Sequence, residues 1–444
     1  MRCFGSPEFR SPSVVRPPAG SPHPRQTLHD HEIRISRLPN LLLLLLAFLG
    51  MSQVKGDYDY ASAIRLSYKF YEAQRAGQLP DNHIPWRKSS FLNDGRDKGI
   101  NLVGGYFDAG DYVKFGFPMA YTTTVLAWGM VEYANAYNKA GLAAAGRAQL
   151  RWATDYFIKA HPSAKKLFGQ VGKGDVDHSY WGRPEDWPSN MERPSYFIDE
   201  DSPGSDLAAE TAAAMAASSM VFRGNDDTYA NTLLRHAREL YAFADENRGL
   251  YSDSITDAQE FYPSSAYEDE LAWAAAWLYR ATRETSYLND AERKYVEFGL
   301  DDRPSEFSWD DKNAGVQVLL AVLTGKTKYK TAVKTFCDYM VNEVPRTPKG
   351  LVFIQKWGVL RHAANVAYVC LVFDVHTSKV VILYDMYFFL VFFCSSCPTV
   401  QACGGCQCSW SYFYSPNPNP NLLEGALVGG PDKQDRFKDD RHLM

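Results

Sequence analysis

The chain has 444 residues, of which 45% are hydrophobic and 22% charged, the balance of a globular protein with a large core. Its net charge of −5 and its scattered basic residues exclude an extended nucleic-acid-binding surface. Aromatic residues make up 14% of the chain, a supply that suits both core packing and stacking on the faces of sugar rings.

The N-terminal part predicts a secretory signal in residues 31–56. Residues 40–50 read NLLLLLLAFLG after Arg34 and Arg37, a run too short to span a bilayer. We expect cleavage near Gly56 and a secreted, extracellular protein that is not in the membrane; a buried leucine-rich helix is the alternative. Residues 1–30, rich in Pro, Ser and Arg, are expected to be a disordered extension or a misassigned start.

From residue 57 to about 374 the dominant pattern is helical, with apolar residues at three-and-four spacing and few alternating β patterns. Short links between successive segments predict an all-α toroid of helical hairpins. Long loops at 79–105, 168–203 and 248–267 hold much of the Trp, Asp and His and are expected to carry function. The predicted helices are 60–75, 121–139, 143–159, 206–222, 227–247, 268–282, 286–299, 313–324, 329–342 and 358–371.

The cysteines fall into two kinds. Cys337 and Cys370 lie in apolar helical runs, where buried free thiols are expected. Five more crowd residues 394–408 in two closely spaced CxxC-like pairs without histidine, so either a zinc site or non-homologous sequence is possible, with zinc the weaker hypothesis.

The segment 104–121, GGYFDAGDYVKFGFPMAY, places Asp108 and Asp111 on a Gly-rich turn among aromatic residues. We expect Gly110 to allow the tight turn, so that both carboxylates point into one cleft, where one holds a water that the other deprotonates. Such tetrapeptides also form helix caps or calcium sites, and these alternatives remain open.

Residues 57–371 resemble the catalytic domain of glycoside hydrolase family 9, the inverting endo-β-1,4-glucanases. The resemblance implies an (α/α)6 barrel and, as partner, a β-1,4-glucan, with no organic cofactor and a monomeric chain. It is carried by segments 70–80, 86–95, 104–129, 169–182, 191–199, 202–222, 251–258, 267–282, 307–321, 357–371 and 415–441.

By this resemblance Asp111 is the general base and Asp108 its partner on the nucleophilic water. The residues that correspond to glucan subsites are His178, Tyr180, Trp181, Tyr262, Trp357 and Arg361. Aromatic rings stack on sugar faces, and His and Arg bond hydroxyl groups. For Trp357 and Arg361 the alternative is a helix N-terminus with a packing tryptophan.

Some family members bind a structural calcium ion through a segment like 264–270. Here Ser265 and Ala266 would offer carbonyls, and Asp269, Glu270 and Asp310 carboxylates, an all-oxygen set that suits calcium. Acidic N-caps of two helices explain the same residues equally well.

The departures from the family concern the end of the chain. Residues 372–394 replace a family segment that leads to a Pro-His-His-Arg motif, and the family continues after Asp439-Asp440-Arg441 into an Asn-Glu-Val-Ala segment with the catalytic acid and a last helix. We therefore expect a domain at 57–444 with a non-family insert at 372–394 and incomplete last hairpins. Cys397 with Cys403, Cys406 or Cys408 corresponds to a family disulfide.

The leading prediction is a secreted endoglucanase that hydrolyses internal bonds of β-1,4-glucan with inversion, and this exact chain is expected to have little activity. The alternatives are a non-catalytic glucan-binding pseudoenzyme and a faulty gene model. Glu424 is a weak candidate for a replacement acid, since it lies upstream of the acid's place.

Overall fold

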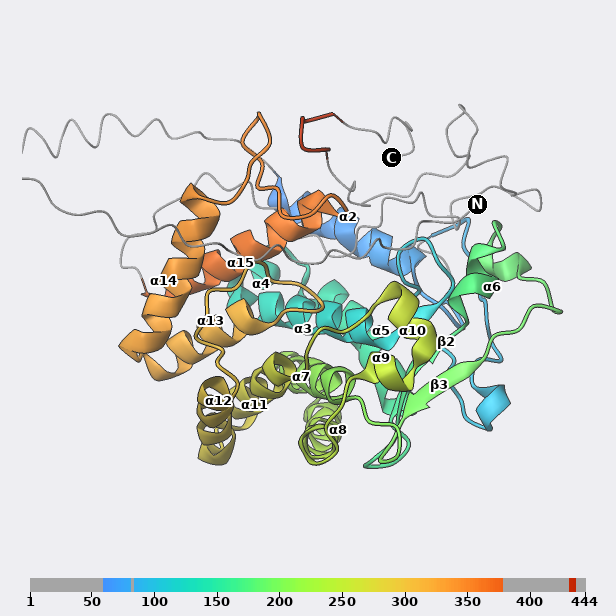
Figure 1. Ribbon diagram of the computed structural model, residues 1–444. Coiled ribbons are helices and arrows are strands. Elements are labelled where there is room, and N and C mark those ends of the chain that lie inside the picture. Colours follow the sequence, from blue (N-terminus) through green and yellow to red (C-terminus); the bar gives the residue numbers. More distant parts are fainter. Residues whose placement is uncertain (1–58, 81–83, 378–430, 437–444) are drawn as a thin grey trace, which may run out of the picture. The chain divides into compact units, whose positions relative to one another are not determined.

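The computed structural model describes residues 59–80, 84–377 and 431–436 (Figure 1). The signal segment, the insert beyond residue 377, the cysteines at 394–408, Glu424 and residues 437–444 lie outside the described residues. The described residues from Tyr60 onward belong to one compact unit, built mainly from helices, as the sequence predicts.

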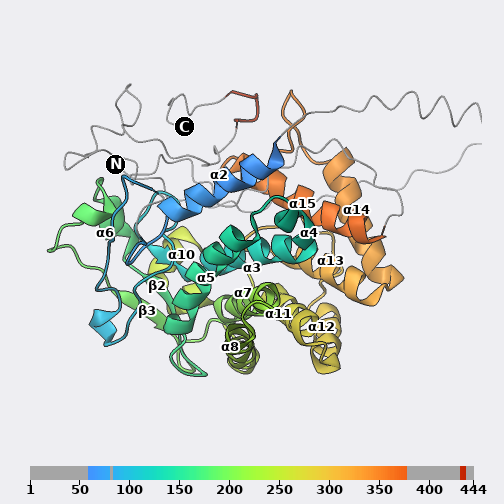
Figure 2. The same cartoon turned by 180° about the vertical axis from the view of Figure 1, so that it is seen from behind.

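The helices fall into an inner and an outer set, and the chain alternates between them (Figures 1 and 2). Successive inner helices pack side by side, and each packs on an outer helix. The inner helices are α3 (Gly116–Glu132), α7 (Ser205–Phe222), α11 (Glu268–Thr282), α13 (Asn313–Thr324) and α15 (Val359–Thr377). The outer helices are α2 (Tyr60–Ala73), α5 (Ala143–Ala160), α8 (Asp227–Glu246), α12 (Thr285–Glu297) and α14 (Thr327–Asn342).

The difference between the two sets follows from their residues. Helix α7 reads SDLAAETAAAMAASSMVF, with small or apolar residues on every face, and is buried along nearly its whole length. Helix α8 instead carries one apolar stripe and a polar face, and Asp226 caps it by accepting the Tyr229 N–H at 3.0 Å. A helix that is apolar all round must be enclosed, whereas an amphipathic helix can cover it and face water.

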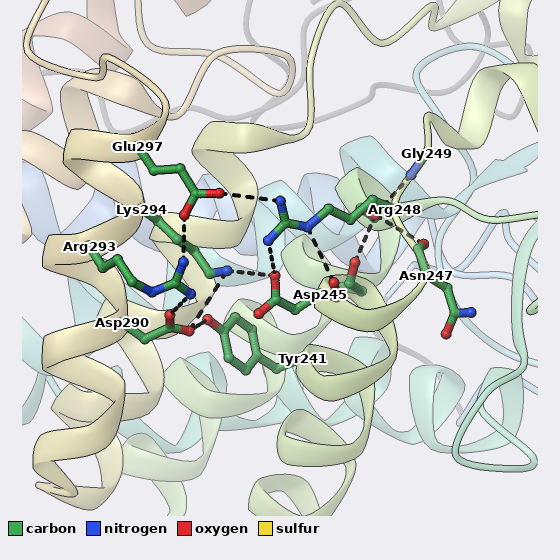
Figure 3. Close-up of polar contacts among 11 residues, drawn as sticks. Tyr241, Asp245, Asn247, Arg248, Gly249, Asp290, Arg293, Lys294 and Glu297 are labelled. Atoms are coloured by element: carbon green, nitrogen blue, oxygen red, sulfur yellow. Dashed lines mark hydrogen bonds and ion pairs between the residues drawn. The ribbon is translucent and has the colours of Figure 1, made fainter.

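Charged side chains join the outer helices α8 and α12 (Figure 3). The buried Lys294 ammonium on α12 lies 2.6 Å from Asp245 on α8, and Arg248 bonds both Asp245 and, at 3.5 Å, Glu297. These ion pairs connect α12 to α8 and to the residues that follow α8.

A small sheet, which the sequence pattern did not reveal, supports the functional loops. Strands β1 (Lys114–Phe115), β2 (Leu167–Val171) and β3 (Ser195–Ile198) pair antiparallel in the order β1-β2-β3. All five residues of β2 are buried, so its sequence lacks the alternation expected of a half-exposed strand. The loops also contain α6 (Gly174–His178), α9 (Tyr251–Ser254), α10 (Thr256–Phe261), η1 (Arg96–Lys98) and η2 (Pro184–Asp186).

The predicted helices 121–139 and 358–371 differ most from the observed ones. The segment predicted as one helix at 121–139 forms α3 and then α4 (Ala134–Lys139), because the backbone leaves helical geometry at Tyr133. Helix α15 continues to Thr377, so the first residues of the predicted insert at 372–394 extend a helix. No helix in the described parts of the chain is both long and apolar enough to cross a membrane.

The prediction of free thiols at Cys337 and Cys370 is wrong, because the two form a disulfide that joins α14 to α15. Their Cα atoms are 5.8 Å apart and 33 residues separate them in sequence. Each cysteine alone looks like an apolar core residue, and only the packing of the two helices brings them together.

Replacing both cysteines with serine is expected to lower the free energy of unfolding by about 2–4 kcal/mol, because the cross-link restricts the unfolded chain. Denaturant unfolding of the wild-type and double-serine chains, monitored by circular dichroism, measures the difference. Equal midpoints, or alkylation of both Cys337 and Cys370 in the unfolded wild-type chain without reductant, would contradict the disulfide.

Candidate functional site

The predicted carboxylate pair lies on a tight turn that follows the buried Phe107. The Asp111 N–H donates to the Asp108 carbonyl at 2.7 Å, and the Asp108 N–H donates to the Val113 carbonyl at 3.0 Å. The residue with positive φ in this turn is Ala109, at 48°, and not Gly110 as the sequence suggested. A non-glycine residue in this region is strained, and strain of this kind is concentrated at functional sites.

Asp108 is the buried member of the pair, with 5% of its surface exposed. One carboxyl oxygen, Oδ2, accepts the Tyr262 hydroxyl at 2.5 Å, while Oδ1 has no hydrogen-bond partner. Burial, and then the negative charge of Asp111, raise the pKa of Asp108 to about 7. The unpartnered oxygen is where an added hydrogen-bond donor, such as a water, is expected.

Asp111 is more exposed and faces His178. The His178 Nε2 atom lies 3.3 Å from Asp111 Oδ1, and the hydrogen bond to Asp111 raises the pKa of His178 to about 9. Helix α6 holds this histidine, and the Asp257 carboxylate accepts the N–H of Gly174 at the start of that helix, at 3.0 Å. The site therefore pairs an accessible carboxylate with a basic imidazole.

Arg361 lies in the first turn of α15, close to Asp108. Burial raises the pKa of Asp108, and the positive charge of Arg361 lowers it by a smaller amount. Its neighbour His362 contacts Glu306 at 2.9 Å. Trp357, just before α15, is 61% exposed, so it is not the packing tryptophan of the alternative interpretation. The structure thus brings Tyr262, His178 and Arg361 to the carboxylate pair.

Tyr180 and Trp181 occupy a different position. They pack on a small cluster formed by Ala76, Phe107 and Tyr112, and the last two of these flank the turn that carries the carboxylates. The Tyr180 hydroxyl donates to the Asp186 carbonyl at 3.1 Å, and its ring lies 5.7 Å from that of Tyr112. Both remain proposed substrate residues, and their observed contacts support the turn.

Asp177 is a site residue that the sequence analysis did not single out. It is 3% exposed and accepts the Tyr112 N–H at 2.9 Å. Burial and the charge of Asp111 raise the pKa of Asp177. Its position next to His178 in the GDVDH segment was the available signal, but spacing alone does not show that it faces Asp111.

The five residues expected to bind calcium remain a prediction, and several of their polar atoms already have partners within the chain. The Glu270 carboxylate is fully buried; its Oε1 atom accepts a hydrogen bond from the Lys312 ammonium at 2.8 Å, and its Oε2 atom has no hydrogen-bond partner. The Lys312 N–H binds Asp269 at 2.5 Å, and the Ser265 N–H binds Asp310 at 2.9 Å. The Ala266 carbonyl accepts the Ser264 hydroxyl at 2.8 Å.

Comparison with known proteins gives the site its context. The family model for glycosyl hydrolase family 9 matches residues 60–444. The chain belongs to glycosyl hydrolase family 9. The resemblance identified from the sequence motifs is therefore confirmed.

Family 9 relatives and structures match most of the chain. Endoglucanase A of Bacillus pumilus is 42% identical over 86% of this chain and 63% of its own length, and endoglucanase 15 of Arabidopsis thaliana is 45% identical over 74% of this chain and 69% of its own length. The endoglucanase of the termite Nasutitermes takasagoensis superimposes with a TM-score of 0.82 at 52% identity, covering 86% of this chain and 93% of that one.

A further family 9 structure, the cellulase Cel9M of C. cellulolyticum in complex with cellobiose, superimposes with a TM-score of 0.78 at 35% identity, covering 86% of this chain and 93% of that one. These superpositions confirm the predicted (α/α)6 barrel. The chain spans from 31% to 66% of the length of three bacterial relatives that it matches.

Proposed function

We propose that this chain is a secreted endo-β-1,4-glucanase. Its site hydrolyses internal bonds of cellulose and related β-glucans with inversion. The observation that carries the proposal is the turn at 108–111, where two carboxylates of unlike environment stand together and one oxygen of Asp108 is unpartnered. Family membership and structural neighbours with bound cello-oligosaccharides support the substrate class.

The proposed mechanism divides the work between the two carboxylates. Asp108, held by the Tyr262 hydroxyl, accepts a hydrogen bond from the attacking water through its free oxygen. Asp111 takes the second proton of that water as it attacks the anomeric carbon, and the His178 imidazole keeps the Asp111 carboxylate oriented. The exposed Trp357 ring and the half-buried Arg361 guanidinium bind the sugar rings of the substrate.

An inverting glycosidase also needs an acid that protonates the leaving oxygen, in the family a Glu beyond the segment matched by Asp439-Asp440-Arg441. We propose that a polypeptide ending at Met444 binds cello-oligosaccharides weakly and hydrolyses them very poorly. A non-catalytic glucan-binding role is the second candidate, favoured by the exposed Trp357 ring, which can bind glucan without the acid.

An oxidising compartment suits the disulfide between Cys337 and Cys370, because structural disulfides persist in secreted proteins. This supports the proposed extracellular location.

The pH dependence tests the role of Asp108. It is measured on an extended chain, residues 57–444 followed by the C-terminal segment of the termite endoglucanase. Asp108 must be ionised to accept the water's hydrogen bond, so kcat/KM is expected to fall as the pH decreases through about 7.

The Tyr262 hydrogen bond lowers the pKa of Asp108, so Tyr262→Phe is expected to shift the acid limb of the profile to higher pH. A limb that stays in place or moves to lower pH in this variant would contradict the role given to Asp108.

A further inference from the structure

Three potential metal ligands converge beside the proposed base. One ligand atom each of Asp111, Asp177 and His178 lies within 4.8 Å of the other two. The separation of 3.3 Å between His178 Nε2 and Asp111 Oδ1 is long for a charge-assisted hydrogen bond. It equals the roughly 3.3 Å that separates two ligands about 2.0–2.1 Å from a zinc ion at the tetrahedral angle.

Asp177 is the second, independent indication of a ligand. Its side chain is buried, with one oxygen accepting the Tyr112 N–H at 2.9 Å. Its other oxygen has no hydrogen bond or ion pair to any residue in the described part of the chain. This oxygen is not fully enclosed, so it is accessible to a ligand from outside the chain, either water or a metal ion.

We propose that His178 Nε2 and the carboxylates of Asp111 and Asp177 form an inhibitory site for a divalent transition metal of the zinc type. One nitrogen and two oxygen ligands suit zinc and leave a fourth position for water, whereas calcium and magnesium require oxygen sets. The bound ion holds the lone pair with which Asp111 accepts a proton, so metal binding and hydrolysis exclude each other. The inhibition, though not the binding, rests on the proposed function.

A second group of three ligands, His161, His236 and Glu239, serves as the internal comparison. The two histidines are buried with their Nδ1 atoms 2.7 Å apart, and the Arg235 guanidinium donates to His236 Nε2 at 2.8 Å. His236 therefore carries its proton on Nδ1 and donates it to His161. These lone pairs are already used, so this group is not expected to bind zinc.

Calorimetric titration of zinc into EDTA-treated chain 57–444 tests the site. The five cysteines at 394–408 are replaced by serine in every version of the chain, so that they cannot bind the added zinc. One equivalent is expected to bind, with affinity at least ten-fold lower in both Asp177→Asn and His178→Gln and unchanged in Glu239→Gln. The Asp177→Asn side chain can still accept the Tyr112 N–H, and circular dichroism checks that each variant folds. A millimolar excess of calcium is expected to leave zinc binding unchanged.

Unchanged zinc affinity in the two site variants, or affinity lost in Glu239→Gln, overturns the proposal. In the extended chain, zinc is expected to inhibit hydrolysis and cellotetraose to weaken zinc binding. If no version of the chain hydrolyses glucan while zinc binding still depends on Asp177 and His178, the proposed function fails and the metal site stands. Zinc binding that cellotetraose does not weaken would overturn the placement of the ion at the base.

Discussion

An Asp111→Asn variant of the extended chain is expected to lose roughly 10²–10⁴-fold in kcat/KM, the typical contribution of a positioned general base. Asparagine keeps the size of the side chain and can still accept a hydrogen bond from His178. It cannot take a proton from water, so the loss is expected in kcat rather than in KM. Initial rates on soluble carboxymethylcellulose measure both constants.

Asp175→Asn is the matched control for this variant. Asp175 is an exposed carboxylate on α6, the helix that also carries His178, and the mechanism gives it no role. Its variant is expected to retain activity within about two-fold. If the two asparagine variants lose activity equally, or if Asp111→Asn retains wild-type kcat, Asp111 is not the base.

The second large effect concerns the leaving-group acid. The extended chain is expected to exceed the polypeptide ending at Met444 by roughly 10²–10⁴-fold in kcat on carboxymethylcellulose, because the departing alkoxide needs a proton.

Comparable turnover by the two chains would show that a residue within the 444 supplies the proton. Glu424→Gln in the shorter chain tests the one carboxylate suggested as a substitute. An unchanged residual rate in that variant is expected, since Glu424 does not stand at the acid's place in the family motif.

The helical architecture was predictable because the pattern of each helix depends on local spacing. The predicted helices 206–222 and 268–282 correspond to α7 and α11, and their boundaries differ by one residue at most. The sheet was not predictable, because β2 is buried on both sides and its sequence does not alternate. The disulfide was not predictable either, since the pairing of Cys337 and Cys370 depends on how α14 and α15 pack.

Part of the candidate site could likewise be predicted. The DAGD segment placed Asp108 and Asp111 together, and the family motifs added His178, Tyr262 and Arg361. The sequence did not show that the Tyr262 hydroxyl bonds Asp108 across 154 residues, or that Asp177 turns toward Asp111. Such contacts form between loops that separate helices bring together. The local spacing of residues in the sequence therefore does not predict them.

The most direct test of the proposed endoglucanase site is the anomeric form of the first product that the extended chain releases from cellotetraose. Proton NMR in the first minutes of the reaction resolves the α and β anomers before mutarotation mixes them. If Asp111 activates a water for a single displacement, the new reducing end appears as the α anomer, and this signal disappears in Asp111→Asn. Initial release of the β anomer would show a covalent, retaining mechanism and would contradict the role assigned to Asp111.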